Sequence, residues 1–202
     1  MALTNSYFKP DQRTPGFVGH PFPDVEARLM DLETKEIHER QDEEGELLIQ
    51  SPCLFDRYLD NPEATEKTFT TDKTGQKWFL TGDCAKKSSK DNGSFQILGR
   101  LSQDIIKKQG YKISALEIES SLLKSPLVKS CAVVGVPHEE YGEEIVAFIV
   151  LKDASDTKAQ HWQIVDFMKE QVSSYKRPRI FEFVESLPVN AMGKVSKKDL
   201  KS

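Results

Sequence analysis

The spacing of hydrophobic and polar residues changes near the middle of the chain. In the first half, short runs alternate between apolar and polar positions, and this period of two is typical of half-buried strands. Residues 25–30 and 45–50 follow the pattern, and residues 78–81 and 94–98 predict a further strand pair around a polar loop at 86–93. The first half is therefore predicted to be rich in strands.

Three other segments of the first half carry turn or helix signals. Residues 18–23 contain a glycine and two prolines, which favour an extended or turning backbone. Residues 54–59 predict a short helical turn. Asn61 followed by Pro62 predicts the start of a helix, because asparagine is a good N-cap and proline fits the first helical turn.

The second half combines helix signals with more continuous apolar runs. Ser114 and Glu117 have the spacing of a capping box at a helix start, and Pro126 marks the end of that helix. The other predicted elements are strands at 131–136, 145–151 and 179–184 and a helix at 157–172, in which Ile164, Phe167, Met168 and Trp162 are predicted to be core.

These patterns predict an α+β fold in two parts. The order changes from strand-rich to mixed near residues 100–104, where Ser102, Gln103 and Asp104 interrupt the apolar pattern. We therefore expect a strand-rich part at residues 1–101 and a small α+β domain at residues 102–202.

The composition is that of a chain with an ordinary hydrophobic core. Of the 202 residues, 38% are hydrophobic and 30% are charged. No apolar run approaches the roughly 18 residues of a membrane span, so none is expected. The start of the chain carries neither a secretory signal nor a transit-peptide pattern.

The charge distribution bears on the class of partner. The net charge is −4, but lysine and arginine exceed the acidic residues after residue 172. That basic segment lacks interleaved aromatic residues and any nucleic-acid-binding motif, so nucleic acid is not an expected partner. A small ligand that bears phosphate fits this local charge better.

The three cysteines predict neither a disulfide nor a metal site. Cys53, Cys84 and Cys131 form no Cys-x-x-Cys pair and no metal box with the four histidines. They are interpreted as buried or reduced thiols in a reducing compartment, and no metal ligand is assigned to the chain.

Three motifs contain the candidate chemistry, and each has a simpler structural interpretation. Asp83 ends the run WFLTGD at 78–83, and its carboxylate could accept hydrogen bonds from a ribose diol or cap its own turn. Arg100 offers a planar fork of donors to ribose or phosphate oxygens, or a surface ion pair. Lys194 lies in LPVNAMGKV at 187–195, where it could stabilise developing phosphoryl charge or remain simply solvated.

The order of these motifs resembles the adenylate-forming enzymes, a superfamily of acyl-CoA synthetases, peptide-synthetase adenylation domains and luciferases. The resemblance implies that Asp83 binds ribose, that Arg100 contacts ribose, and that Lys194 is the catalytic lysine, all three serving nucleotide binding. It also implies that residues 1–101 are the C-terminal portion of a large AMP-binding domain, and residues 102–202 a mobile C-terminal domain.

The run from Gly99 onward implies two further roles by the same resemblance. Ser102 stands at the expected hinge, although one extra residue before Lys107 leaves Gln103 and Asp104 as alternatives. Gly110, with Tyr111 and Lys112 beside it, matches the glycine that lines the pantetheine tunnel and so implies coenzyme A binding. Gln109 departs from the family pattern, in which a glycine is common.

The wording of residues 104–107 and 110–117 is most similar to the malonyl-CoA synthetase group, which is mitochondrial in animals. Such enzymes convert an acid and ATP, with Mg²⁺, into an acyl-adenylate and pyrophosphate, and coenzyme A then displaces AMP. The resemblance implies a malonate ligase of fatty acid metabolism. The alternatives are a ligase for another short- or medium-chain acid, or an inactive fragment that binds nucleotide or coenzyme A. A cytoplasmic location is the alternative to a mitochondrial one.

Two motifs of the superfamily are missing from the chain. There is no Ser/Thr/Gly-rich phosphate loop and no Tyr-Gly-x-Thr-Glu segment for adenine and Mg²⁺. The chain is therefore expected to be the C-terminal part of a longer enzyme, inactive by itself. Its expected partners are ATP, coenzyme A, a carboxylic acid and the missing N-terminal adenylation domain, which would hold most of the Mg²⁺ ligands.

Overall fold

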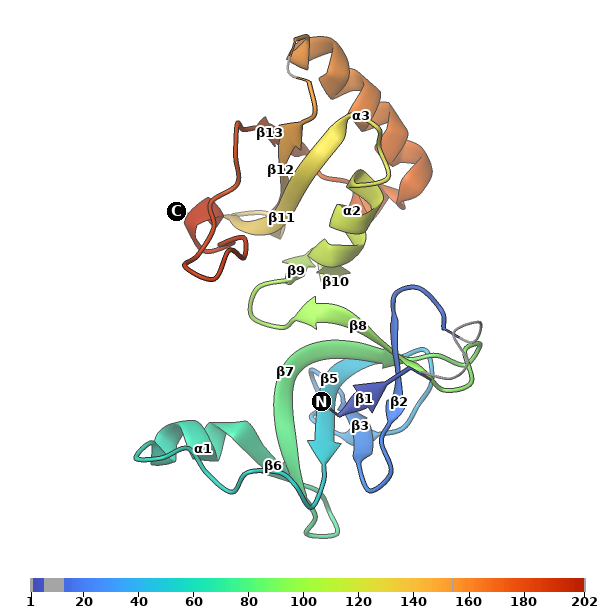
Figure 1. The fold of residues 1–202 in the computed structure, drawn as a ribbon, viewed down its shortest axis with the longest axis vertical. Helices are drawn as coiled ribbons and strands as arrows, with labels where there is room; N and C mark the ends of the chain where they lie inside the picture. Colours follow the sequence, from blue (N-terminus) through green and yellow to red (C-terminus); the bar gives the residue numbers. More distant parts are fainter. Residues whose placement is uncertain (1, 6–12, 154, 202) are drawn as a thin grey trace. The chain divides into compact units, whose positions relative to one another are not determined.

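The computed structural model describes residues 2–5, 13–153 and 155–201. The chain divides into two compact units, Met1–Leu101 (unit 1) and Ser102–Ser202 (unit 2). Strands dominate unit 1, and helices accompany the strands of unit 2 (Figure 1). The predicted α+β class is confirmed. In the described residues no helix is long and apolar enough to cross a membrane.

Unit 1 is built on an antiparallel sheet with the strand order β1-β2-β8-β7-β5-β3-β4, and β6 also pairs with β7. Its elements are β1 (Leu3–Thr4), β2 (Phe17–Pro21), β3 (Glu26–Met30), β4 (Ile37–His38), β5 (Glu44–Gln50), α1 (Pro62–Thr68), β6 (Phe69–Thr71), β7 (Lys77–Lys87) and β8 (Phe95–Arg100).

Most of the elements predicted for unit 1 are confirmed. The runs at 25–30 and 45–50 form β3 and β5, and Asn61 caps α1 by accepting a hydrogen bond from the backbone of Ala64. The helical turn predicted at 54–59 is wrong, because this segment is a loop. Its rings pack instead: Phe55 lies 5.0 Å from Tyr58 and 5.6 Å from Phe79 between ring centroids.

Strand β7 is the central strand of the unit 1 sheet and is sharply curved (Figure 1). It pairs with β5 along one edge, whereas along the other edge it pairs first with β6 and then with β8. The register with β5 shifts between Glu46 and Leu48, opposite a bulge at residues 81–83. Gly82 has φ +74°, a value that side chains with a Cβ disfavour, so the glycine permits the bulge.

The core of unit 1 lies on both sides of this sheet. One side buries Leu29, Leu47, Ile49, Ala85 and Phe95, and the other buries Trp78 against Leu48 and Met30. The indole N–H of Trp78 donates to Asp72 at 3.0 Å. The Thr74 hydroxyl and the Trp78 indole, which both donate to the Asp72 carboxylate, hold its pKa well below the usual range.

Unit 2 has a five-stranded sheet, ordered β10-β9-β12-β11, with β13 parallel to β12. Its elements are β9 (Ile105–Lys108), β10 (Tyr111–Ser114), α2 (Ala115–Leu122), β11 (Val128–His138), β12 (Gly142–Leu151), α3 (Thr157–Gln171), η2 (Ser174–Lys176), β13 (Ile180–Phe183) and η3 (Asp199–Lys201).

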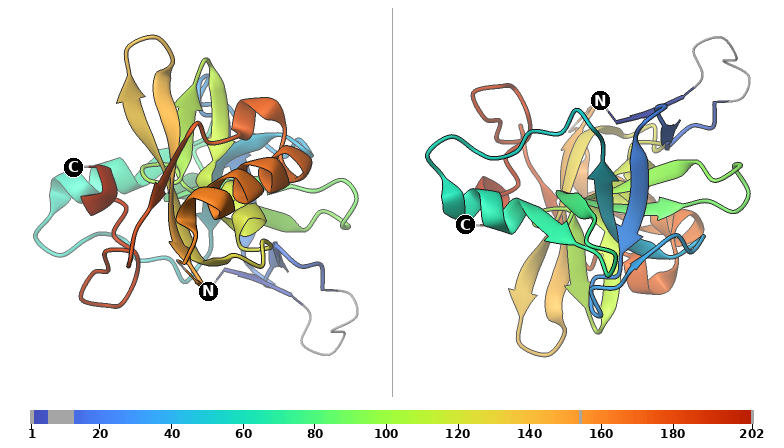
Figure 2. Two further views of the ribbon diagram at one scale, coloured as in Figure 1. Left: turned by 90° about the horizontal axis from the view of Figure 1, so that it is seen from above. Right: turned by 90° about the horizontal axis from the view of Figure 1, so that it is seen from below.

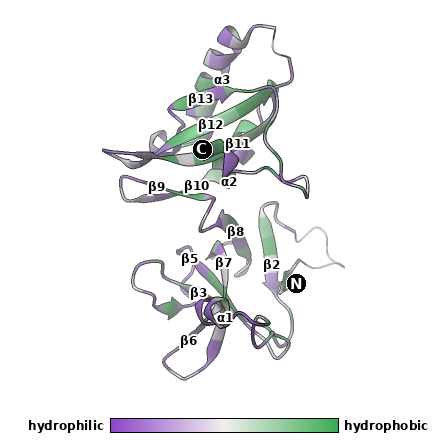
Figure 3. Cartoon of the chain, turned by 90° about the vertical axis from the view of Figure 1, so that its left-hand side faces the viewer, coloured by the Kyte–Doolittle hydropathy of each residue, from purple (hydrophilic) through white to green (hydrophobic). Residues whose placement is uncertain are grey.

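Helices α2 and α3 bury their apolar stripes against this sheet. Ile118 and Leu122 of α2 and Ile164 and Met168 of α3 share one core with Ile145 and its neighbours on β12. The two helices contact each other, as the left view of Figure 2 shows, and Figure 3 shows hydrophobic residues along β11 and β12. The strands predicted at 131–136, 145–151 and 179–184 are thereby confirmed.

Two details of unit 2 differ from the sequence prediction. Trp162 is 62% exposed and not core, because the buried positions of α3, Ile164 and Met168, lie on another face of the helix. The indole contacts His161 instead, with ring centroids 5.3 Å apart. Helix α2 begins as predicted, with Ser114 accepting a hydrogen bond from the Glu117 amide, but it ends at Leu122, before Pro126.

Gln109 is expected to cost the β9–β10 hairpin some stability. It has φ +51° and precedes Gly110 at φ +81°, so both residues of the two-residue turn are left-handed. A non-glycine residue in this conformation costs about 1–2 kcal/mol, and asparagine tolerates it best. We expect Gln109→Asn to raise the free energy of unfolding of unit 2 by about 0.5–1 kcal/mol in urea denaturation. Gln103→Asn, on a neighbouring exposed glutamine, is the matched control, and an equal gain there would contradict this reasoning.

Candidate functional site

Asp83 and Arg100 lie directly opposite each other at the bulge of β7. They are register partners across β7 and β8, and the Arg100 Nε lies 2.9 Å from the Asp83 carboxylate. Arg100 also donates from Nη1 to the carbonyl of Thr81 at 2.6 Å. Two residues that are 17 positions apart in the sequence are therefore fixed as a carboxylate–guanidinium pair.

The backbone of the bulge is held by side chains around this pair. Thr81 Oγ1 donates to the Leu47 carbonyl at 2.7 Å, and the amide of Asp83 donates back to the same hydroxyl at 3.1 Å. The amide of Gly82 donates to Glu46 at 3.1 Å. Burial raises the pKa of Glu46, and the nearby Asp83 charge adds to the effect although the Gly82 hydrogen bond opposes it. Sequence reasoning did not single out Glu46.

The ion pair remains accessible to solvent. The side chain of Asp83 is 28% exposed and that of Arg100 is 57% exposed. An exposed pair contributes less than about 1 kcal/mol to stability. The pair therefore presents hydrogen-bonding groups at the bulge without being essential to the core.

Lys194 projects from a tight hairpin in unit 2. The hairpin is closed by a bridge between Val189 and Val195 and by the amide of Asn190, which donates to the Lys194 carbonyl at 2.8 Å. The Asn190 side chain accepts from the amides of Met192 and Lys194 at 3.0 Å each. Gly193 adopts φ +76° with open space around it. The result is an ordered backbone with an exposed, extendable lysine.

Gly110, Tyr111 and Lys112 lie on the β9–β10 hairpin, a different hairpin of unit 2 from that of Lys194. Gly110 has no neighbour within 4 Å of where a Cβ would stand. The Tyr111 ring is 54% exposed and stacks on Tyr175, with centroids 4.8 Å apart and planes at 29°. Tyr175 is not predicted by any local sequence pattern, because the stack joins segments that are far apart in the chain.

The segment with the three hinge candidates is a turn at residues 101–104. Ser102 and Gln103 are exposed, whereas Asp104 is buried and binds Lys197 at 2.6 Å. The same turn is fixed at its start, where the amide of Leu101 donates to the Gly82 carbonyl at 3.0 Å. Of the three candidates, Ser102 and Gln103 therefore have the freer side chains.

The described residues include no group of three or more His, Cys, Asp or Glu side chains placed to hold a metal ion. Of the thiols, Cys53 is exposed, Cys84 is buried and Cys131 is partly buried. Burial raises the pKa of Cys131 to about 12, and the Glu119 carboxylate acts in the same direction. Such a thiol stays protonated and is a poor nucleophile.

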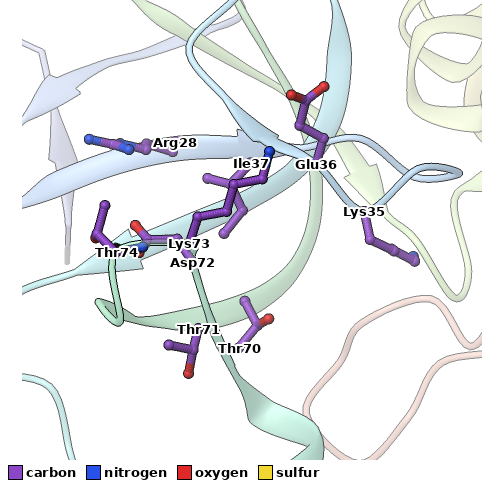
Figure 4. A pocket seen from close by; sticks show the side chains of 9 residues that line it. All are labelled: Arg28, Lys35, Glu36, Ile37, Thr70, Thr71, Asp72, Lys73 and Thr74. Atoms are coloured by element: carbon purple, nitrogen blue, oxygen red, sulfur yellow. Dashed lines mark hydrogen bonds between the residues drawn. The ribbon is translucent and has the colours of Figure 1, made fainter.

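A pocket of about 280 Å³ on unit 1 lies apart from these residues (Figure 4). Its charged lining residues have both signs, among them Arg28, Lys73 and Asp72, and the Asp72 carboxylate is occupied by the Thr74 hydroxyl at 2.6 Å. Neither Asp83 nor Arg100 lines this pocket, so it adds nothing to the site.

Comparison with known proteins places these features in a family. Residues 117–194 match the family model of the AMP-binding enzyme C-terminal domain. The chain is 40% identical over 197 residues to the malonate–CoA ligase of Arabidopsis thaliana. This match covers 94% of this chain and 31% of that protein. It is 38% identical to the mitochondrial malonate–CoA ligase ACSF3 of Mus musculus, covering 99% of the chain and 35% of the relative. The chain belongs to the adenylate-forming superfamily.

Solved structures of adenylate-forming enzymes agree with this assignment. ATP-bound MatB from Rhodopseudomonas palustris matches with a TM-score of 0.82 at 33% identity, over 100% of this chain and 38% of that one. The o-succinylbenzoate CoA synthetase of Bacillus subtilis with its acyl-adenylate matches with a TM-score of 0.83 at 27% identity, over the same shares of each chain. The chain thus spans about a third of the length of its curated relatives.

Proposed function

We propose that this chain is the C-terminal part of an ATP-dependent carboxylic acid–CoA ligase whose acid is malonate. The observation that carries the proposal is the pairing of Asp83 with Arg100 at 2.9 Å on a bulge of β7. The names of the relatives, CoA ligases and malonate–CoA ligases, support the reaction class and the acid. In this proposal residues 1–101 complete the large AMP-binding domain and residues 102–202 are the mobile domain.

The chemistry of the bulge suits a nucleotide ribose. The Asp83 carboxylate is an acceptor of the kind that binds two vicinal hydroxyls, and the Arg100 guanidinium beside it is a planar set of N–H donors suited to ribose oxygens. Their ion pair aligns both groups before a nucleotide arrives, which reduces the entropy lost on binding. We assign ribose binding to Asp83 and ribose contact to Arg100.

The hairpin of Lys194 suits a lysine that must be delivered to a reacting group. Its backbone is fixed by Asn190 and the Val189–Val195 bridge, while its ammonium is an exposed point charge. Charge develops on the carboxylate and the α-phosphate as the acyl-adenylate forms, and a positioned cation stabilises it. Most of the groups that would hold Mg²⁺ lie outside this chain.

The β9–β10 hairpin suits the thiol-delivering cofactor. Open space at Gly110 allows a narrow chain such as pantetheine to pass close to the backbone, and a side chain there would obstruct it. The exposed Tyr111–Tyr175 stack offers an aromatic face on which the adenine base of coenzyme A could stack, and Lys112 is a cation next to Tyr111. We assign coenzyme A binding to Gly110, Tyr111 and Lys112, and the hinge to Ser102.

The alternative is a ligase for a medium-chain acid. The chain is also 38% identical to the medium-chain acyl-CoA ligase ACSF2 of Mus musculus, and this match covers 90% of the chain. This equals its identity to the mouse malonate ligase, so the C-terminal part does not separate the two acids. Both mouse relatives are named mitochondrial, and we propose that compartment for this protein.

Pyrophosphate exchange tests the proposal. The complete ligase that contains this chain should exchange pyrophosphate into ATP with malonate and much less with acetate or a medium-chain acid. The 202-residue chain alone should give no exchange above a blank, because it contains no phosphate loop. Preference for a medium-chain acid would make the protein a medium-chain acyl-CoA ligase. Exchange by the 202-residue chain alone would contradict the proposal that this chain holds only part of the adenylation site.

A further inference from the structure

A nearly buried ionic triad joins three distant segments of unit 2. The ammonium of Lys197 lies 2.6 Å from Asp104 and 2.7 Å from Glu119. The three side chains are between 10% and 14% exposed. The segments are the turn before β9, helix α2 and the tail that follows the Lys194 hairpin.

The triad is built for one cation between two acids. Glu119 also accepts a hydrogen bond from the amide of Val133 on β11 at 2.8 Å, which fixes its carboxylate against the sheet. Both carboxylates lose much of their hydration in the fold, and Lys197 is the cation that they share. Charged groups this deeply buried are costly unless paired, so the position strongly favours a lysine or arginine.

The Lys194 hairpin depends on its flanks for its orientation. The hydrogen bonds described for residues 188–195 are made within the hairpin, as between Asn190 and Lys194 or between the Ser196 amide and the Pro188 carbonyl. On its N-terminal side, the Val184 amide donates to the Ile149 carbonyl at 3.0 Å. On its C-terminal side, Lys197 binds the body of unit 2 three residues after Lys194.

We propose that Lys197 is a positioning residue, whose ammonium between Asp104 and Glu119 fixes the C-terminal base of the hairpin and so sets where Lys194 can reach. The proposal rests on the function proposed for Lys194. The anchoring of the tail by Lys197 can still be tested independently of that function, because the release of the tail can be measured without any enzymatic reaction.

Trypsin cleavage after Lys194 measures the release of the tail in the 202-residue chain. Lys197→Met keeps the length of the side chain but removes the charge, and the rate of this cleavage should rise at least about tenfold, because proteolysis follows the open population. Lys197→Arg should stay near the wild-type rate, since its guanidinium can bind both acids. Lys198→Met, on the exposed neighbour, is the matched control and should change nothing.

A neutral variant guards against a folding defect. Lys197→Met with Asp104→Asn and Glu119→Gln removes all three charges together, which buried ionic groups often tolerate. It should fold and still show the faster cleavage after Lys194. Wild-type cleavage rates in Lys197→Met or in the neutral variant would overturn the proposal, as would equal acceleration by Lys198→Met.

In the complete ligase, Lys197→Met should lower kcat for adenylate formation about tenfold and leave the KM for ATP and thioester formation from supplied adenylate nearly unchanged. Lys197→Arg should restore kcat. If the cleavage result holds while adenylate formation is unaffected in both Lys197→Met and Lys194→Ala, the function proposed for Lys194 fails and the anchoring of the tail stands. If only Lys194→Ala is impaired, the positioning role of Lys197 is overturned.

Discussion

Replacing Lys194 by alanine in the complete ligase is expected to slow acyl-adenylate formation by about 10²-fold or more, the scale of losing one electrostatic stabiliser of a transition state. Thioester formation from adenylate supplied ready-made should be largely spared, because the lysine is proposed to act in the first half-reaction alone. Pyrophosphate exchange measures the first step, and AMP release on addition of coenzyme A measures the second. Lys198→Ala, on the same tail, should leave both steps unchanged.

Gly110→Leu should produce the reverse pattern. A leucine side chain would fill the open space beside the β9–β10 turn and force a branched residue into a left-handed conformation at φ +81°. Thioester formation should fall while pyrophosphate exchange is nearly retained. Equal loss of both steps in both variants would mean that these residues serve folding, and the two-step assignment would be wrong.

The buried pair of Lys108 and Glu144 is expected to dominate the stability of unit 2 among single charged residues. Their side chains are 8% and 7% exposed, and Lys108 donates to the carboxylate that also accepts from the Ile145 amide at 2.9 Å. Lys108→Met would leave Glu144 buried, with Arg179 at 3.7 Å as a weaker partner. Loss of one partner of a buried pair costs about 3–5 kcal/mol, and Arg179 should hold the effect near the lower end.

Urea denaturation followed by circular dichroism would measure this loss. Lys108→Met with Glu144→Leu removes the pair as a whole and should recover most of the stability. The exposed Lys67–Glu63 pair provides the control, since Lys67→Met should change the free energy of unfolding by less than about 0.5 kcal/mol. An equally small effect of Lys108→Met would contradict this prediction, because it would show that Glu144 can stay charged without Lys108 at little cost in stability.

The pH dependence of this contribution follows from the direction of the Glu144 pKa. Burial raises the pKa, but the hydrogen bonds from Lys108 and the Ile145 amide, together with the charges of Lys108 and Arg179, outweigh it, and the pKa lies below its ordinary value of 4.5. A carboxyl with a lowered folded pKa stabilises the fold above the unfolded pKa and loses that contribution as the pH falls through the folded value. The advantage of the wild type over Glu144→Gln should therefore be full at neutral pH and shrink below about pH 4.5.

Local patterns predicted the elements of this fold better than they predicted its side-chain partners. The period of two in β3 and the caps at Asn61 and Ser114 depend on neighbours in the sequence, so the chain itself contains the signal. Trp162 was misjudged because hydrophobicity alone does not show which helical face meets the sheet. The loop at 54–59 was misjudged because its apolar residues pack as a cluster of rings.

The candidate site shows the same division. Motif order singled out Asp83, Arg100 and Lys194, but nothing in the sequence shows that Arg100 binds Asp83 and the Thr81 carbonyl together. Glu46, Tyr175 and Lys197 were missed because their roles depend on contacts across the fold, at sequence separations that no local pattern encodes. Lys197 in particular is one of two adjacent lysines that look equivalent in the sequence.

The placement of the two tryptophans makes the chain's own fluorescence a selective reporter. Each unit contains one indole, and Trp78 is fully buried whereas Trp162 is 62% exposed. Unfolding of unit 1 moves an indole from an apolar environment into water and shifts its emission to the red, but unfolding of unit 2 changes the surroundings of Trp162 little. A melting curve read from the emission maximum would therefore look like a single transition while following unit 1 alone. Acrylamide would quench Trp162 already in the folded protein and Trp78 only after unit 1 unfolds, so quenching also follows unit 1, and the stability of unit 2 has to be followed by circular dichroism.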